Sequence, residues 1–399
     1  MVATTPFHER LAPMNQTGLW QHWSGHLAAV KYVMSEKFEY FAVRNAAGLI
    51  DTSPLYKYRI TGRDAERYLG FVLARDIRMC RDGQAQYTLW CDEDGWVVED
   101  GVVFRHSSDH FLLTAAEPNL AYFQRLIGPL QVEIEEVSAQ YGSIALQGPR
   151  SRTILASVAP ELESLKFFHH AQVKFGNSAI GVSRTGYTGD LGYELWVDAD
   201  DANDVFDTLM DASAGHGVLP VGMAALLMTR IEAGLVLIDA DFHSSRYAFT
   251  TEEKSTPVEL GFAWMFKGIG TTDRQFIGRD AIRREIAERT SRWKMVGLVV
   301  DWEDWDRRYR AHGLIPPKDE TPIVYEMMLY DDAGERVGYT TSFMYSPVLQ
   351  RHIAMARVRP HLGAPGSKVN LELTIDHRYQ TVAATVARPP LFNPARKSS

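Results

Sequence analysis

Glu194 and the glycines before it form the stretch of sequence best suited to binding chemistry. The stretch Ser183–Val197 reads SRTGYTGDLGYELWV, with glycine at positions 186, 189 and 192. Glycine adopts positive φ at little cost and lets a ligand approach the backbone. A carboxylate fixed on a strand beside such a loop suits a planar ligand with two adjacent N–H donors. Judged by spacing alone, a glycine-rich β-hairpin with a surface glutamate explains the same pattern.

A second candidate is Asp100, the later member of the acidic pair Glu99-Asp100. The segments Tyr87–Cys91 and Gly95–Phe104 predict a hairpin, because the strong turn sequence Asp-Glu-Asp-Gly at 92–95 joins them. A carboxylate on such a strand could accept a proton or stabilise positive charge that develops on a nitrogen atom. The plain alternative is an exposed acid on a hairpin strand.

The elements that must hold these residues alternate between strands and helices up to about residue 290. Helices are predicted over Phe38–Ile50, Asp64–Leu73, Arg150–Ala159, Ala202–Ala212, Met223–Gly234 and Arg279–Thr290. Later strands are predicted over Met295–Val300, Ile323–Tyr330, Val337–Phe343, His352–Val358, Lys368–Ile375 and Gln380–Val386. The charged stretch Asp301–Thr321 is predicted to be a solvated loop. We therefore expect an α+β fold with a C-terminal β-barrel or sandwich domain.

The composition is typical of a soluble globular protein of two or three domains. The chain has 399 residues, of which 45% are hydrophobic and 23% charged. A net charge of −8 argues against nucleic-acid binding, and no apolar run reaches the length of a membrane span. Two cysteines and an N-terminus without a signal-peptide pattern favour a cytoplasmic location. No metal site is expected, since the adjacent His169 and His170 would face opposite sides of a strand.

Motifs along nearly the whole chain resemble the aminomethyltransferase family, which comprises the glycine cleavage T-protein and its folate-dependent relatives. Besides the glycine stretch, the similar segments are Tyr40–Leu55 (YFAVRNAAGLIDTSPL), Gly83–Arg105, Leu219–Leu235 (LPVGMAALLMTRIEAGL), Pro257–Lys267 (PVELGFAWMFK), Phe276–Ile282 (FIGRDAI) and Thr340–Val358. The resemblance implies tetrahydrofolate as cofactor and a three-domain cloverleaf of the T-protein type. The implied domains are a folate-binding domain one (1–53 and 141–245), an α+β domain two (54–140 and 246–290) and a C-terminal β-barrel (291–399).

The same resemblance implies roles for individual residues. Asp100 matches the family's acid beside the reacting folate nitrogens, so it is the predicted catalytic residue. Tyr87 matches the tyrosine that precedes this acid at a fixed spacing, and Glu194 matches the glutamate that binds the pterin ring. Tyr187 and Trp264 match aromatic residues that flank the ring. These five residues form the predicted folate site.

The segment Leu219–Leu235 contains the most informative departure from the family. The family usually has arginine and then aspartate where this chain has Leu226-Leu227, and that arginine helps to bind substrate in the T-proteins. The change removes an anchor for a polar, aminomethylated substrate. Nearby aromatic residues could instead hold a ring or an onium methyl group. The candidate substrate contacts are Tyr32, Tyr56, Trp96, Leu226 and Arg230.

We therefore predict a tetrahydrofolate-dependent transferase, a demethylase that moves a methyl group from a small O-, N- or S-methylated substrate to tetrahydrofolate. One alternative is the aminomethyltransferase T-protein of the glycine cleavage system, which would act with a lipoylated carrier protein. The other is a folate-binding module without turnover. The residues leave the identity of the methyl donor open.

Overall fold

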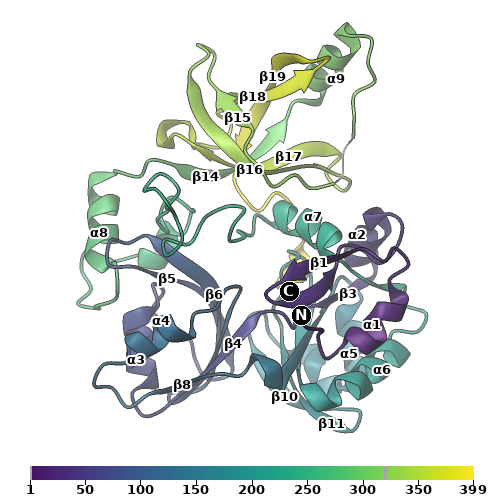
Figure 1. Ribbon diagram of the computed structural model, residues 1–399, viewed down its shortest axis with the longest axis vertical. Helices are drawn as coiled ribbons and strands as arrows, with labels where there is room; N and C mark the ends of the chain where they lie inside the picture. The colour runs from purple at the N-terminus through teal and green to yellow at the C-terminus, as the bar shows by residue number, and fades with distance from the viewer. Residues whose placement is uncertain (1, 319–320) are drawn as a thin grey trace.

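The computed structural model describes residues 2–318 and 321–399, which form three lobes joined at the centre of the molecule (Figure 1). Two lobes are each built on a β-sheet with helices, and the third is a closed β-barrel. In the view of Figure 1 the barrel lies at the top, and the two sheet lobes lie below it on either side. This arrangement confirms the predicted α+β fold with a C-terminal barrel.

The first lobe is built on a six-stranded sheet in the order β10-β11-β12-β9-β3-β13. Its strands are β3 (Ala47–Asp51), β9 (Tyr141–Gln147), β10 (His170–Phe175), β11 (Ser178–Ser183), β12 (Gly192–Asp198) and β13 (Val218–Pro220). Its helices are α1 (His8–Leu11), α2 (Glu36–Asn45), α5 (Ser151–Val158), α6 (Ala202–Ala212) and α7 (Met223–Ala233), and a hairpin comprises β1 (Trp20–Trp23) and β2 (His26–Ala29). Strands β11 and β12 flank the glycine stretch, with Ser183 opposite Glu194 in an antiparallel register. The stretch is therefore a hairpin, as predicted.

The second lobe is built on a five-stranded antiparallel sheet in the order β5-β6-β7-β4-β8. Its strands are β4 (Tyr56–Thr61), β5 (Gln84–Cys91), β6 (Val97–Ser107), β7 (His110–Ala115) and β8 (Glu133–Glu136). Helices α3 (Ala65–Val72), α4 (Leu120–Arg125) and α8 (Arg279–Glu288) belong to the same lobe. The predicted hairpin of β5 and β6 is present, and its alternation buries Trp90 completely in the lobe's core.

The third lobe is a closed barrel with the strand order β14-β17-β16-β15-β18-β19. Its strands are β14 (Lys294–Val300), β15 (Met328–Tyr330), β16 (Arg336–Ser346), β17 (Arg351–Val358), β18 (Lys368–Ile375) and β19 (Arg378–Ala387). Pairing of β14 with both β17 and β19 closes the barrel and removes free sheet edges. The sheets of the three lobes use the segments that the sequence assigns to three domains, while the proposed boundaries themselves stay a prediction.

Two buried ion-pair networks fix α7 between the lobes. The carboxylate of Glu232 accepts hydrogen bonds from Arg44 of α2 (2.6 Å) and from Ser346 of the barrel (2.5 Å). Two residues earlier, Arg230 pairs with Asp241 at 2.5 Å, and its other terminal nitrogen donates to a barrel serine. Because removal of one partner would leave a buried charge unpaired, these networks hold the relative positions of α7 and the barrel strongly.

Two predicted elements are wrong. The segment Phe38–Ile50 is not one helix, because α2 ends at Asn45 and β3 begins at Ala47. Pairing of β3 with β9 and β13 overrides the helical pattern, and Gly48 leaves room for valine side chains that a Cβ atom would overlap. The charged segment after β14 is not a loop throughout, since α9 covers Trp302–Ala311. Asp301 caps this helix by accepting from two backbone N–H groups, each at 3.0 Å.

No helix within the described residues is long and apolar enough to cross a membrane.

Candidate functional site

Asp100 and Tyr87 form the polar centre of the candidate site. They lie on neighbouring strands β6 and β5, and the Tyr87 hydroxyl donates to Asp100 Oδ2 at 2.9 Å. Burial raises the pKa of Asp100 to about 6, while the hydrogen bond from Tyr87 opposes this rise and the nearby Asp241 adds to it. The group therefore titrates close to neutral pH and is mostly ionised at pH 7, which suits a carboxylate that exchanges protons or stabilises a cation.

Strand alternation separates the roles of the two adjacent acids. Glu99 faces the core of the second lobe, where it is 1% exposed and accepts from the backbone of Ala116 and Glu117 and from Asn119. Burial raises the pKa of Glu99 to about 8. Asp100 points the other way, toward the centre of the molecule. Of the pair, Asp100 is therefore the carboxylate that can meet a ligand.

Glu194 lies on β12 and is the carboxylate of the glycine hairpin. Its side chain is partly buried and accepts a hydrogen bond from Thr185 Oγ1, the one side-chain donor among the described residues. Burial raises the pKa of Glu194, while Thr185 and the positive charge of Lys57 lower it. Lys57 is itself fully buried and donates to two backbone carbonyl groups, each at 2.8 Å. Glu194 keeps capacity to accept further N–H groups from a ligand.

The glycines of the hairpin are required by packing rather than by an approaching ligand. A Cβ atom at Gly186 or Gly192 would overlap the buried amide of Gln147. Gly189 has φ +71°, and a Cβ atom there would overlap Ala233 of α7. The hairpin thus sits tightly on β9 and α7, and this close packing fixes the positions of the residues between and after the glycines.

Tyr187 links the glycine hairpin to the apolar centre of the molecule. Its hydroxyl donates to the carbonyl of Val236, and its ring packs against the buried cluster that contains Leu226. Burial and the negative charge of Asp100 raise the pKa of the phenol, which therefore stays neutral. Leu226 is 5% exposed in this cluster, so the helix α7 presents an apolar side chain at the position where the sequence resemblance implies an arginine.

Trp264 lies at the edge of this site rather than within it. It belongs to the short 3-10 turn Ala263–Phe266 and is 55% exposed. One face of its ring holds the guanidinium of Arg75 at 5.0 Å, and Arg75 donates to the carbonyl of Tyr87 at 3.1 Å. A chain of contacts therefore runs from Trp264 to Arg75, from Arg75 to Tyr87, and from Tyr87 to Asp100.

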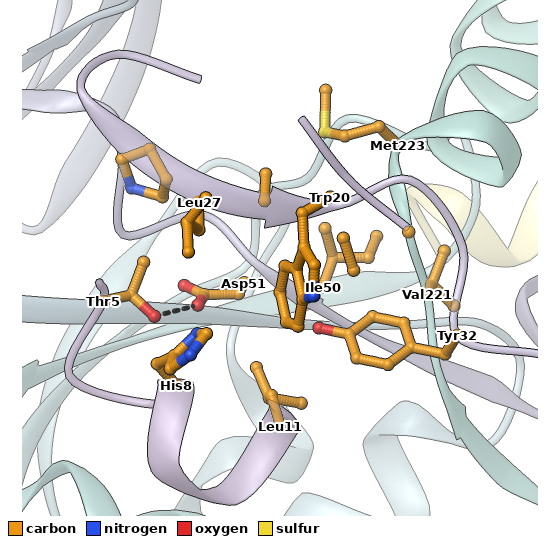
Figure 2. Close-up of a pocket in the computed structure, with 14 residues that line it drawn as sticks. Thr5, His8, Leu11, Trp20, Leu27, Tyr32, Ile50, Asp51, Val221 and Met223 are labelled. Atoms are coloured by element: carbon orange, nitrogen blue, oxygen red, sulfur yellow. Dashed lines mark hydrogen bonds between the residues drawn. The ribbon is translucent and has the colours of Figure 1, made fainter. Parts of the chain in front are cut away.

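The remaining candidate substrate contacts do not converge with these residues. Tyr32 faces a small cavity of about 20 Å³ near α1 and β1, where Thr5 donates to Asp51 at 2.5 Å (Figure 2). Tyr56 stacks on a neighbouring tyrosine of β4, and Trp96 lies under the guanidinium of Arg292. A cavity of that size holds about one water molecule, so it is too small for an aromatic substrate.

The fifth candidate, Arg230, is fully buried in its pair with Asp241 and lies close to Tyr187. Its contacts account for a structural role. Asp241 and a neighbouring barrel threonine also line a larger cleft of about 750 Å³ between the loop after α7 and the barrel. The negative charge of Asp241 contributes to the raised pKa of Asp100, but the candidate folate-site residues do not line this cleft.

Sequence reasoning missed Lys57, Arg75 and Asp241. For Lys57 the available signal was its position between two tyrosines on a predicted strand, where the lysine side chain lies on the face opposite to the tyrosines. Arg75 follows the end of α3 and Asp241 lies in a loop, so neither has a periodic pattern that would indicate its surroundings.

The site residues fit tetrahydrofolate. Glu194 offers a partly buried carboxylate with free acceptor capacity, which matches the adjacent amide and amino N–H groups of a pterin. Tyr187, in the same hairpin, offers a fixed ring that could flank the pterin, and Asp100 offers a carboxylate that could meet the reacting nitrogens. Folate would therefore be held by the first lobe at its ring and by the second lobe near its reacting atoms.

Comparisons with known proteins agree with this geometry. Residues 8–268 match the family model described as the GCVT N-terminal domain, and residues 310–393 match the glycine cleavage T-protein C-terminal barrel domain. An aminomethyltransferase of Clostridium botulinum strain Loch Maree is 30% identical over 357 residues, covering 86% of this chain and 88% of the relative. An aminomethyltransferase of Pseudothermotoga lettingae is 29% identical over 366 residues, covering 90% and 91%.

The fold has a solved counterpart as well. The crystal structure of the glycine cleavage system aminomethyltransferase T from Bartonella henselae aligns with a TM-score of 0.81, at 22% identity and over 98% of this chain and 99% of that one. The protein is thus a folate-dependent one-carbon transferase with the T-protein fold. The chain belongs to the aminomethyltransferase family of the glycine cleavage T-protein, whose members depend on tetrahydrofolate.

Proposed function

We propose that this protein is an aminomethyltransferase that takes its one-carbon unit from an aminomethyl group on the sulfur of a lipoylated carrier protein. In the balanced reaction the carbon leaves its sulfur and its amino group, and a thiol and ammonia are released. Tetrahydrofolate supplies the two nitrogens, N5 and N10, that bind the carbon and lose their protons. The full-length likeness to proteins named aminomethyltransferases supports this choice over the methyl donor predicted from the sequence.

The observation that carries the proposal is the hydrogen-bonded pair of Tyr87 and Asp100. A carboxylate with a pKa of about 6 can stabilise an iminium-like or ammonium charge and can take up a proton as ammonia leaves. Tyr87 orients this carboxylate by donating to one oxygen, which leaves the other oxygen for the reacting atoms. Glu194 would hold the pterin ring, and the Tyr187 ring would limit its movement.

A second candidate function, transfer of a methyl group from a small methylated compound, is favoured by one specific observation. Leu226 places an apolar side chain in the cluster around Tyr187, so α7 contributes no cation there for a polar donor. Such a wall suits a donor whose leaving part is itself apolar or aromatic. We keep this candidate because it predicts a different product, 5-methyltetrahydrofolate.

One experiment separates the candidates. The purified protein is incubated with tetrahydrofolate and either aminomethyl-loaded lipoylated carrier protein or a panel of O-, N- and S-methyl compounds. Mass spectrometry of the folate products and an ammonia assay then identify the reaction. Methylenetetrahydrofolate with ammonia supports the proposal, whereas methyltetrahydrofolate alone supports the second candidate.

Variants distinguish an enzyme from a folate-binding module. Asp100→Asn should lower the turnover rate by about 10²–10⁴-fold with little change in folate affinity, because the charge matters most as the reaction proceeds. Asp94→Asn, in the exposed turn of the same hairpin, is the matched control and should retain full activity. Folate binding without turnover on any donor would favour the binding-module alternative.

A further inference from the structure

We propose that Arg75 and Trp264 form a carboxylate-binding subsite at the edge of the folate site. The inference rests on the proposed folate-dependent function and deepens it. It assigns to this pair the anionic end of a ligand whose reacting end lies at Asp100.

The hydrogen bonding of Arg75 leaves most of its guanidinium free. The side chain is partly buried, and its one hydrogen bond to the described residues runs from Nη1 to the carbonyl of Tyr87 at 3.1 Å. It forms no ion pair within residues 2–318 and 321–399, and the neighbouring Asp76 is bound by Arg78 instead. Burial lowers the pKa of Arg75, so its charge lies in an environment that favours an anionic partner.

Other partly buried arginines of the same region use more of their terminal N–H groups within the protein, although the Nε of Arg274 has no hydrogen-bond partner among the described residues. Arg274 donates to three backbone carbonyl groups at the end of α3 and beyond it. Arg292 pairs with Glu259 at 3.1 Å and also donates to two carbonyl groups. The remaining N–H groups of Arg75 can therefore bind an anionic ligand without displacing a partner within the described residues.

Trp264 holds the guanidinium in a geometry suited to a carboxylate. Stacking at 5.0 Å fixes the plane of the guanidinium and leaves the N–H groups at its edge available. The turn that carries Trp264 is anchored by Phe266, which is 5% exposed and stacks on Phe276. A planar fork held in this way matches a carboxylate by two parallel hydrogen bonds.

The position of the pair determines which ligands reach it. Arg75 contacts the carbonyl of Tyr87, whose hydroxyl contacts Asp100, so one tyrosine separates the guanidinium from the catalytic carboxylate. The carboxylate must therefore lie at the far end of a ligand rather than beside its reacting atom. Two sources have this chemistry: the glutamyl tail of tetrahydrofolate and, under the second candidate function, a methyl donor that carries its own carboxylate.

The test compares dissociation constants, measured by isothermal titration calorimetry, for tetrahydrofolate and for 6-methyltetrahydropterin, which keeps the ring but lacks the tail. The variants are Arg75→Gln, Arg75→Lys and Trp264→Leu. The matched control is Arg359→Gln, because Arg359 stacks on Trp293 at 4.4 Å and also lacks an ion pair among the described residues. Circular dichroism and Tm confirm that each variant is folded.

If the folate tail is the source, Arg75→Gln weakens tetrahydrofolate binding about tenfold or more and leaves the pterin unchanged. Arg75→Lys should fall between the two, because it keeps the charge but loses the planar fork. If the donor is the source, both constants stay unchanged. Arg75→Gln then raises the KM for vanillate but not for guaiacol, which lacks the carboxylate. If the protein does not turn these compounds over, the same difference is expected in their dissociation constants.

The inference is overturned if Arg75→Gln matches the wild type with tetrahydrofolate, 6-methyltetrahydropterin, vanillate and guaiacol. It is also overturned if Arg359→Gln, and not Arg75→Gln, loses the part of the tetrahydrofolate affinity that comes from the glutamyl tail. A wild-type protein that binds neither folate nor pterin overturns the proposed function and this inference together. Intact folate binding with an unaffected Arg75→Gln overturns the inference alone.

Discussion

Replacing Gly189 with alanine should destabilise the protein by about 1–5 kcal/mol. An alanine at φ +71° costs about 1–2 kcal/mol in the left-handed region. Its methyl group would overlap Ala233 Cβ and lie 3.2 Å from Ala233 Cα, which adds about 1–3 kcal/mol of overpacking against α7. The smaller entropy of the unfolded alanine chain offsets about 0.4–1 kcal/mol of this sum.

The matched control is Gly215→Ala, which isolates the backbone term. Gly215 has φ +76°, but a Cβ atom there would meet nothing within 4 Å. We expect a loss of about 1 kcal/mol or less, because the strain remains and the overlap is absent. The comparison therefore measures how tightly the glycine hairpin packs on α7.

The assay is urea denaturation followed by circular dichroism, with the free energy of unfolding taken by linear extrapolation. Tetrahydrofolate affinity should also fall in Gly189→Ala, since Tyr187 and Glu194 flank the strained position. Equal stabilities of Gly189→Ala and Gly215→Ala would refute the argument that packing requires the hairpin glycines.

Three further predictions concern charges. The rate with wild-type protein should fall as pH drops through about 6, because Asp100 becomes protonated. Tyr87→Phe should move the midpoint of this pH–rate profile upward, because it removes the hydrogen-bond donor that stabilises the ionised Asp100. A flat pH–rate profile would exclude Asp100 as the acting base. Glu194→Gln should weaken tetrahydrofolate binding by about 1–3 kcal/mol, because one amide N–H would face a pterin donor, and unchanged calorimetric affinity would place the ring elsewhere. His352 is buried and has no hydrogen-bond partner among the described residues, and burial lowers its pKa to about 4. The free energy of unfolding should therefore decrease by about 3 kcal/mol as pH falls from 6.5 to 4, because the unfolded chain binds the extra proton in this range. His352→Phe should flatten that dependence, and an unaltered slope would contradict the assignment.

Local patterns in the sequence determined the elements whose pairing is between neighbours. The turn sequence at 92–95 and the alternation on either side predicted the β5–β6 hairpin, and the same alternation turns Glu99 inward and Asp100 outward. Among the barrel strands, β18 and β19 show the alternation of buried and more exposed residues that local pattern can predict, whereas β14, β16 and β17 are buried along most of their length. The resemblance then identified the family, the fold and the folate dependence, all of which the comparisons confirm.

Tertiary contacts decided what local patterns could not express. Ala47–Asp51 is a strand because β9 and β13 lie beside it, although its sequence continues a helical pattern. The helix α9 had a local signal in its capping residue Asp301, but the dense charge of the segment favoured a solvated loop. Tyr32 and Trp96 share the aromatic character of a substrate pocket, yet they lie apart from Asp100.

The candidate site shows most clearly which features the sequence determined and which the tertiary structure decided. Sequence determined that Asp100, Tyr187 and Glu194 are present on strands and a hairpin of the required kind. Packing between lobes brought Tyr187 within electrostatic reach of Asp100. Contacts inside the second lobe placed Arg75 at the carbonyl of Tyr87, with most of its guanidinium unpaired among the described residues. The physical reason is that periodicity and turn chemistry belong to contiguous residues, whereas a site between lobes depends on contacts between residues separated by a hundred positions or more.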